Sequence, residues 1–180
     1  TQANSGTVTV TSSDSGIDGS SGGTVISTGV ASKGRSGTVR VSTGTATTDR
    51  AGGIHVTVGG SGVGVGGGIR LSAGRTADVQ HGGVVSIGSG ASAQTSSGNV
   101  DIFSADSGAS GASGDVALRT GTTAMGEAGA VRLSTGVSSG SGGEISMEVG
   151  SAAAGPGGDV VLHAGDSSAR AQTGGNVLIE

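Results

Sequence analysis

Apolar residues come in pairs along this chain, with one variable residue between the two members, and the pairs recur about every fifteen residues. Two residues at spacing i, i+2 lie on the same side of an extended strand, and β-branched residues suit a pleated surface. The pattern therefore predicts one short strand in each of twelve repeats. The first members of the pairs are Val8, Val25, Val39, Ile54, Ile69, Val85, Val100, Val116, Val131, Ile145, Val160 and Val177.

The remainder of each repeat is as regular as the pair. The residue between the two members varies freely, as Arg40, Asp101 and Ala117 illustrate, and is expected to face outward. A small third candidate for the inner side follows two positions after the pair, and a glycine usually comes next, as in Thr43 and Gly44. Glycine there allows a positive φ, and a sharp corner of the chain is expected.

A repeat of this length cannot bury its apolar side alone, so stacking of successive repeats is expected. The predicted fold is all-β: a parallel β-solenoid of about twelve fifteen-residue repeats, with one repeat per coil preferred over two. An antiparallel meander is disfavoured because hairpins prefer shorter loops. The predicted structural ladder consists of Val8, Val39, Ile69, Leu71, Val100, Ile102, Val116, Leu118, Val131, Leu133, Val160 and Leu162. The predicted corner glycines are Gly44, Gly74, Gly121, Gly136 and Gly165.

Composition narrows the classes of protein that remain. The 180 residues include 41 Gly and one Phe but no Trp, Tyr or Cys, so a core would have to be thin and made of small side chains. Gly, Ser and Thr at this density do not hold a helix. A disordered Gly/Ser-rich linker is the alternative, but such a linker has no reason to keep apolar pairs at constant spacing.

Charge and cysteine content exclude several partners. Nine basic and thirteen acidic residues are scattered singly and leave a net charge of −4. Because there is no basic run, binding to nucleic acid is not expected, and no apolar run is long enough to span a membrane. The absence of Cys excludes a disulfide scaffold and a thiolate metal site.

No stretch of the sequence predicts an enzyme or a cofactor. Gly59–Gly68 has the glycine spacing of a phosphate loop, but neither the Lys-Ser/Thr pair nor a helix follows it. The three histidines, His55, His81 and His163, lacked metal-ligand spacing, and Asp14 and Asp18 suit an ordinary turn. A calcium ladder is the alternative for the acidic or amide residue before several pairs: Asn99, Asp115, Glu144, Asp159 and Asn176.

Two stretches resemble surface adhesins. The repeat GGDVVLHAG, Gly157–Gly165, resembles the solenoid repeats of secreted surface adhesins such as filamentous-haemagglutinin-like passengers. The stretch VSIGSGASAQTSSGNV, Val85–Val100, resembles the head repeat of trimeric autotransporter adhesins. This resemblance implies an extracellular structural or adhesive role and no catalysis.

The predicted function is that of an extracellular or cell-surface structural protein: a rigid spacer, filament or adhesin stalk. Residues 1–180 are expected to form a single repeat array, an excerpt of a longer array or a fibre-forming segment, because neither end shows a capping pattern. The expected partners are neighbouring copies end to end, surface glycans or other extracellular matrix, and Ser and Thr at the turns are candidate sites of O-glycosylation. The alternative function is an ice-binding solenoid with outward ranks of Thr and Ser, such as Thr45, Thr47 and Thr48.

Overall fold

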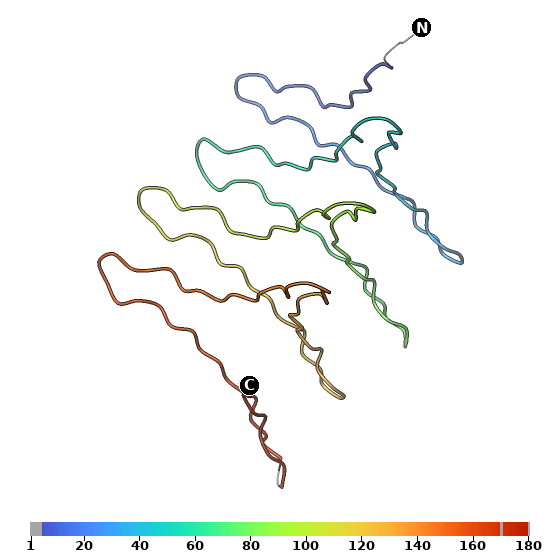
Figure 1. Ribbon diagram of the computed structural model, residues 1–180. Helices are drawn as coiled ribbons and strands as arrows, with labels where there is room; N and C mark the ends of the chain where they lie inside the picture. Colours follow the sequence, from blue (N-terminus) through green and yellow to red (C-terminus); the bar gives the residue numbers. More distant parts are fainter. Residues whose placement is uncertain (1–4, 170, 180) are drawn as a thin grey trace. The chain divides into compact units, whose positions relative to one another are not determined.

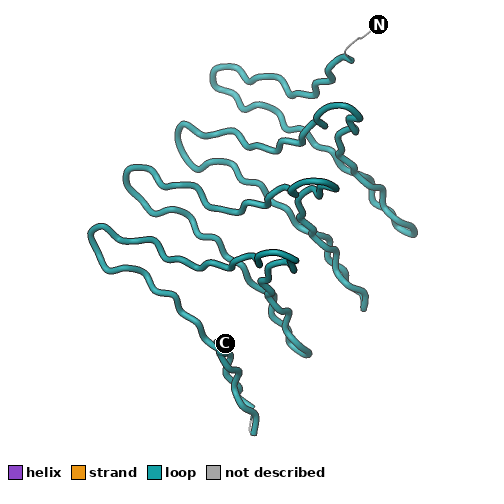
Figure 2. The backbone as a smooth tube through the Cα atoms, viewed as in Figure 1, coloured by secondary structure: helices purple, strands orange, loops and turns teal. Residues whose placement is uncertain are grey.

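The computed structural model describes residues 5–169 and 171–179, and in these residues it contains neither helix nor strand. The backbone is drawn throughout as loop in Figure 2. The chain nevertheless keeps a strict local order, because it reverses direction about once in every fifteen residues. The bends lie at 32–34, 47–49, 62–64, 77–80, 93–95, 109–111, 124–126, 139–141 and 153–155, and a turn at 17–18 precedes them.

Each reversal forms the end of an arm, which we define as the stretch that leaves the main path, bends and returns to its starting point. Figure 1 shows the arms as excursions of the ribbon, broad at the left of the view and narrow and twisted at the lower right. An arm begins at the third small residue of a repeat and ends at the glycine before the next apolar pair. Thr43 and Gly52 come together in this way on either side of the bend at 47–49. We call this point of closure the neck, and the stretch between two arms, which carries the apolar pair, the ladder segment.

Backbone hydrogen bonds in the described residues are few and local. Three of them close necks: Gly83 N–H donates to Gly74 C=O at 2.9 Å, Gly98 N–H to Gly90 C=O at 3.0 Å, and Gly175 N–H to Gly165 C=O at 2.8 Å. A fourth bond closes the turn at 17–18, where Gly19 N–H donates to Gly16 C=O at 3.2 Å. All of these bonds join residues of one arm or turn, so they fold each arm without tying one repeat to the next.

The described part of the chain has no hydrophobic core. None of its side chains is buried, and only Thr76, Ser104 and Ala164 are half-buried. The accessible surface is 18245 Å². A folded protein of this mass, 16.6 kDa, exposes about 7,600 Å² and its unfolded chain about 24,000 Å². The surface of this chain therefore lies much nearer to the unfolded value.

The prediction of a parallel β-solenoid is wrong for this structure. A solenoid requires each repeat to lie within hydrogen-bonding distance of the next, with its apolar pair stacked on that of the neighbour. Here the neck folds each repeat back onto itself, and the described backbone has no hydrogen bond between ladder segments. Because the chain does not form a solenoid, the preference for one repeat per coil over two no longer applies.

The predicted corner glycines do not adopt the conformation that was expected of them. Gly44, Gly74, Gly121, Gly136 and Gly165 have no φ in the left-handed region. Positive φ instead occurs at Gly64 (98°), Gly111 (134°) and Gly126 (109°), which lie at three of the bends, and at Ala171 (63°). The left-handed glycines are thus in the middle of arms, where the path turns back, and not directly after the ladder segments.

The chain divides by its contacts into an amino-terminal half, Thr1–Ile87, and a carboxy-terminal half, Gly88–Glu180. Each half consists of the same alternation of ladder segment and arm. Among the described residues there is no helix of the length and apolar character needed to cross a membrane.

Candidate functional site

The most regular side-chain contact of the molecule is at the necks. A methyl group placed on Gly67 would lie 2.5 Å from Cγ1 of Val58, and one placed on Gly158 would lie 2.9 Å from Cγ1 of Val149. Such distances are shorter than real carbon–carbon contacts, so at these two necks a side chain on the returning residue would force the valine or the backbone to shift. The same arrangement, with somewhat longer distances, pairs Gly37 with Thr28, Gly129 with Thr120 and Gly143 with Thr135.

Hydroxyl groups shape the arms between the necks. Ser61 Oγ donates to the carbonyl oxygen of Val63 at 2.7 Å, and Thr123 Oγ1 donates to that of Met125 at 2.9 Å. At another bend the N–H of Thr95 donates to Ser92 Oγ at 2.9 Å. Ser and Thr side chains that bond to the backbone two or three residues away are typical of tight turns. The high Ser and Thr content therefore serves arm formation.

The predicted ladder residues lie on the ladder segments, as their spacing required, but they are exposed. From Val39 onward the first member of each pair is 49–59% exposed and the second member 58–85% exposed. Val8, nearer the amino terminus, is 90% exposed. The structure thus places all of the predicted ladder on repeated, accessible apolar positions and does not bring its members together in a buried column.

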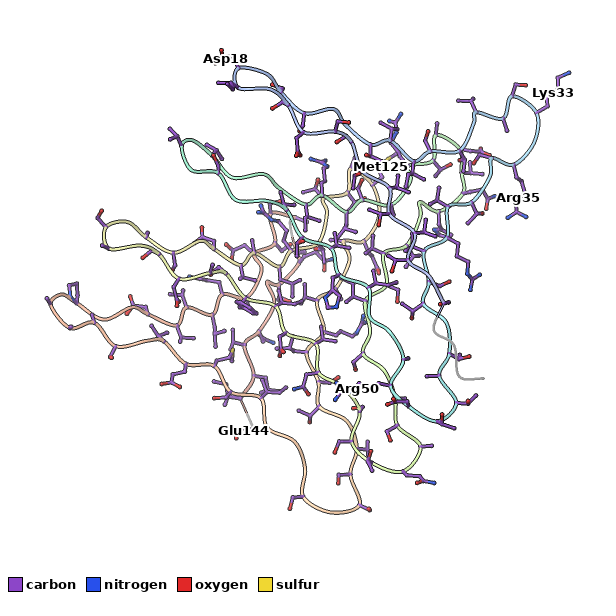
Figure 3. The ribbon with its side chains drawn as sticks, turned by 90° about the horizontal axis from the view of Figure 1, so that it is seen from above. Asp18, Lys33, Arg35, Arg50, Met125 and Glu144 are labelled. Carbon is purple, nitrogen blue, oxygen red and sulfur yellow. The ribbon has the colours of Figure 1, made fainter. Side chains whose placement is uncertain are left out.

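Charged residues occupy both kinds of segment. Figure 3 labels Asp18, Lys33, Arg35 and Arg50, which lie on arms of the amino-terminal half. Asp18 belongs to the turn at 17–18 and Lys33 to the bend at 32–34, so their side chains project from the ends of arms (Figure 3). Arg40 and Arg70 lie instead between the two members of an apolar pair. The arms and the ladder segments therefore present separate sets of charges.

The residues weighed for chemistry do not form a site in the described part of the chain. Residues 5–169 and 171–179 contain no cavity, and no three of their His, Asp and Glu side chains come close enough to hold a metal ion. Gly62 and Gly64 of the glycine-rich stretch form an arm bend rather than a phosphate loop. Thr47 and Thr48 also lie at a bend.

The sequence interpretation missed the importance of the neck glycine, the one that precedes each apolar pair. The sequence does contain a sign of this role, because a second glycine ends almost every repeat. Its role depends on a contact with a residue nine or so positions earlier, which strand periodicity does not reveal. The feature that the structure assigns to the repeat is therefore a closed arm between two open apolar segments.

No protein-family model, curated protein or solved structure matches this chain.

Proposed function

We propose that this protein is an extracellular structural protein, a repetitive spacer of the kind found in a surface filament or adhesin stalk. The observation that carries the proposal is the recurrence of one neck, with the same pair of positions in contact, along both halves of the chain. A catalytic protein concentrates its special geometry at one place, whereas a spacer repeats one geometry along its length.

The distribution of variable residues supports a spacer. The positions that fold a repeat are the neck residue, the neck glycine and the bend, and these use Gly, Ser and Thr or a small apolar residue. Other arm residues range from Lys33 to Asp106 and Gln94 without a change of arrangement. A chain of this design tolerates insertion or loss of whole repeats, which is how a spacer changes its length.

The proposed spacer would resist stretching in a different way from a solenoid. Hydrogen bonds between coils would have resisted extension, but the bonds observed here lie within single arms. Any load-bearing strength in the proposed spacer must therefore come from association of its ladder segments with other surfaces.

The location and role are tested together by labelling intact producing cells with an antibody raised against the chain. The expected result is surface labelling that is lost when intact cells are treated with protease, together with thin extended structures in electron micrographs of the labelled material. Labelling that appears only after the cells are made permeable would contradict the proposal. An antibody to an internal protein of the same cells controls for leakage.

A further inference from the structure

We propose that the ladder segments bind a second copy of this chain, with the amino-terminal half of one copy laid along the carboxy-terminal half of another. This inference deepens the proposed structural role by naming the partner and the surface that binds it. It rests on three observations: an unpaired backbone, an exposed repeated apolar surface and an opposite charge on the two halves.

The backbone of the ladder segments is free to pair. The hydrogen bonds of the described backbone involve Gly19, Gly83, Gly98, Gln172 and Gly175 as donors, and all of these lie in arms or turns. Open backbone that carries Val, Ile or Leu at alternate positions is a template for another extended chain, which supplies the missing donors and acceptors. The ladder segments have this character in repeat after repeat.

The apolar surface that is left open is large. The chain exposes about 10,000 Å² more surface, polar and apolar together, than a folded protein of its mass, whereas a stable interface between two proteins buries only about 1,600 Å² in total. The exposed residues include the whole predicted ladder, from Val8 to Leu162. Covering even part of this surface would supply the apolar burial that the single chain lacks.

The regular spacing of the apolar pairs favours a second copy of this chain as the partner that binds the ladder segments. Apolar pairs recur about every fifteen residues in both halves, so two copies shifted by a whole number of repeats can bring a pair against a pair all along their overlap. An unrelated partner would match one pair and lose register at the next. A surface with this regular spacing is therefore most complementary to itself.

The net charges of the two halves favour one particular shift, counted in repeats, between the two copies. Residues 1–87 contain six Lys or Arg and four Asp, a net charge of +2, whereas residues 88–180 contain three Arg and nine Asp or Glu, a net charge of −6. Like halves would repel each other, whereas unlike halves attract. The stagger that lays an amino-terminal half on a carboxy-terminal half is thus favoured.

Some of the charges behind this shift lie on the ladder segments. Arg40 and Arg70 lie within apolar pairs of the amino-terminal half. In the carboxy-terminal half Glu144 and Glu148 flank the pair of Ile145 and Met147, and Asp159 precedes Val160. A shift of seven repeats brings the segment with Arg40 against the segment with Glu144 and Glu148.

A staggered overlap leaves one half of each copy unpaired at either end of the pair. Each free half can bind a further copy in the same way, and such a head-to-tail contact grows as an open filament. The proposed partner is therefore a series of copies joined by overlapping halves.

The test measures self-association of the full chain by sedimentation velocity and light scattering over a range of concentrations, at about 20 mM and about 500 mM salt. Large assemblies are expected at low salt, and their size should fall at high salt because the attraction between the halves is screened. The double variant Arg40→Glu, Arg70→Glu should raise the concentration needed for half-maximal assembly about tenfold or more, and so should Glu144→Lys, Glu148→Lys.

Mixing the two double variants provides the decisive comparison. In the mixture, the unaltered amino-terminal half of the Glu144→Lys, Glu148→Lys variant, with a net charge of +2, meets the unaltered carboxy-terminal half of the Arg40→Glu, Arg70→Glu variant, with a net charge of −6, so the mixture should assemble at a lower concentration than either variant alone. The matched control is Lys33→Glu, Arg35→Glu, which makes the same change of net charge on an arm and should assemble within about twofold of the unaltered chain.

Three results would overturn the proposal: a chain that stays monomeric at low salt, arm and ladder variants that weaken assembly equally, or a mixture that assembles no better than its components. These results are independent of the antibody experiment. A monomeric chain on the cell surface would remove the assembly and leave the structural role, whereas an assembling chain found only inside cells would do the reverse.

Discussion

At the scale of single residues, the neck glycine lies against the residue that begins the arm. Gly67 approaches Val58 so closely that an added methyl group would lie 2.5 Å from Cγ1, whereas Gly68 has no neighbour within 4 Å of that position. Neither glycine has a φ in the left-handed region, so both backbones accept alanine. The two adjacent glycines therefore separate the effect of contact from that of glycine content.

We expect Gly67→Ala to open the arm between residues 58 and 67 and Gly68→Ala to leave it closed. The reason is steric, because the new methyl group has to displace the Val58 side chain or the backbone of the neck. Nuclear Overhauser contacts between the Val58 methyl groups and residue 67 measure the closure. Loss of these contacts in both variants, or in neither, would show that the neck is not closed by a contact at this glycine.

At the scale of elements, the arm and the ladder segment differ in what they offer to a partner. Arms satisfy some of their own polar groups through Ser and Thr, as Ser61 and Thr123 do. The described ladder segments form no such backbone bonds. Pairing with other copies should therefore cover the ladder segments and leave the arms accessible.

Limited digestion with trypsin tests this difference between the two elements. In assemblies formed at low salt, cleavage after Lys33 and Arg35, on an arm, is expected to be fast, and cleavage after Arg40 and Arg70, on ladder segments, slow. At high salt all four sites should be cut at similar rates because the ladder segments are then uncovered. Mass spectrometry of the fragments follows each site, and uniform cleavage in the assembled state would contradict the assignment of ladder segments to the interface.

Much of an element could be predicted from the sequence, but the partner of its backbone could not. The i, i+2 spacing of Val116 and Leu118 predicts the repeat and its apolar positions from the sequence alone. Spacing of this kind shows which side chains lie on the same side of an extended segment. It does not show whether the segment that pairs with it belongs to the next repeat or to another molecule. The neck was missed because the contact of Gly129 with Thr120 depends on how the arm between them bends.

At the scale of the whole molecule, the absence of buried side chains in the described residues governs stability. Cooperative unfolding draws its heat-capacity change from apolar surface that becomes exposed, and here that surface is already open. We expect calorimetry of the full chain at high salt to show no cooperative heat-absorption peak. The change in heat capacity should be far below the usual value of about 12–15 cal/mol/K per residue. A sharp peak that does not depend on protein concentration would contradict this expectation.

The closed arms also store chain length, which is released when a neck opens. The residues that meet at a neck are about nine positions apart, so opening one arm adds about 30 Å of extended chain to the path. A neck hydrogen bond contributes about 1 kcal/mol, and spreading that energy over about 30 Å corresponds to a force of only a few piconewtons. Stretching a single copy at high salt should therefore give a smooth lengthening below about 10 pN, and abrupt steps at much higher force would contradict it. A tether made of such arms would lengthen under a sudden pull as its arms open, well before a large force reaches its attachment points.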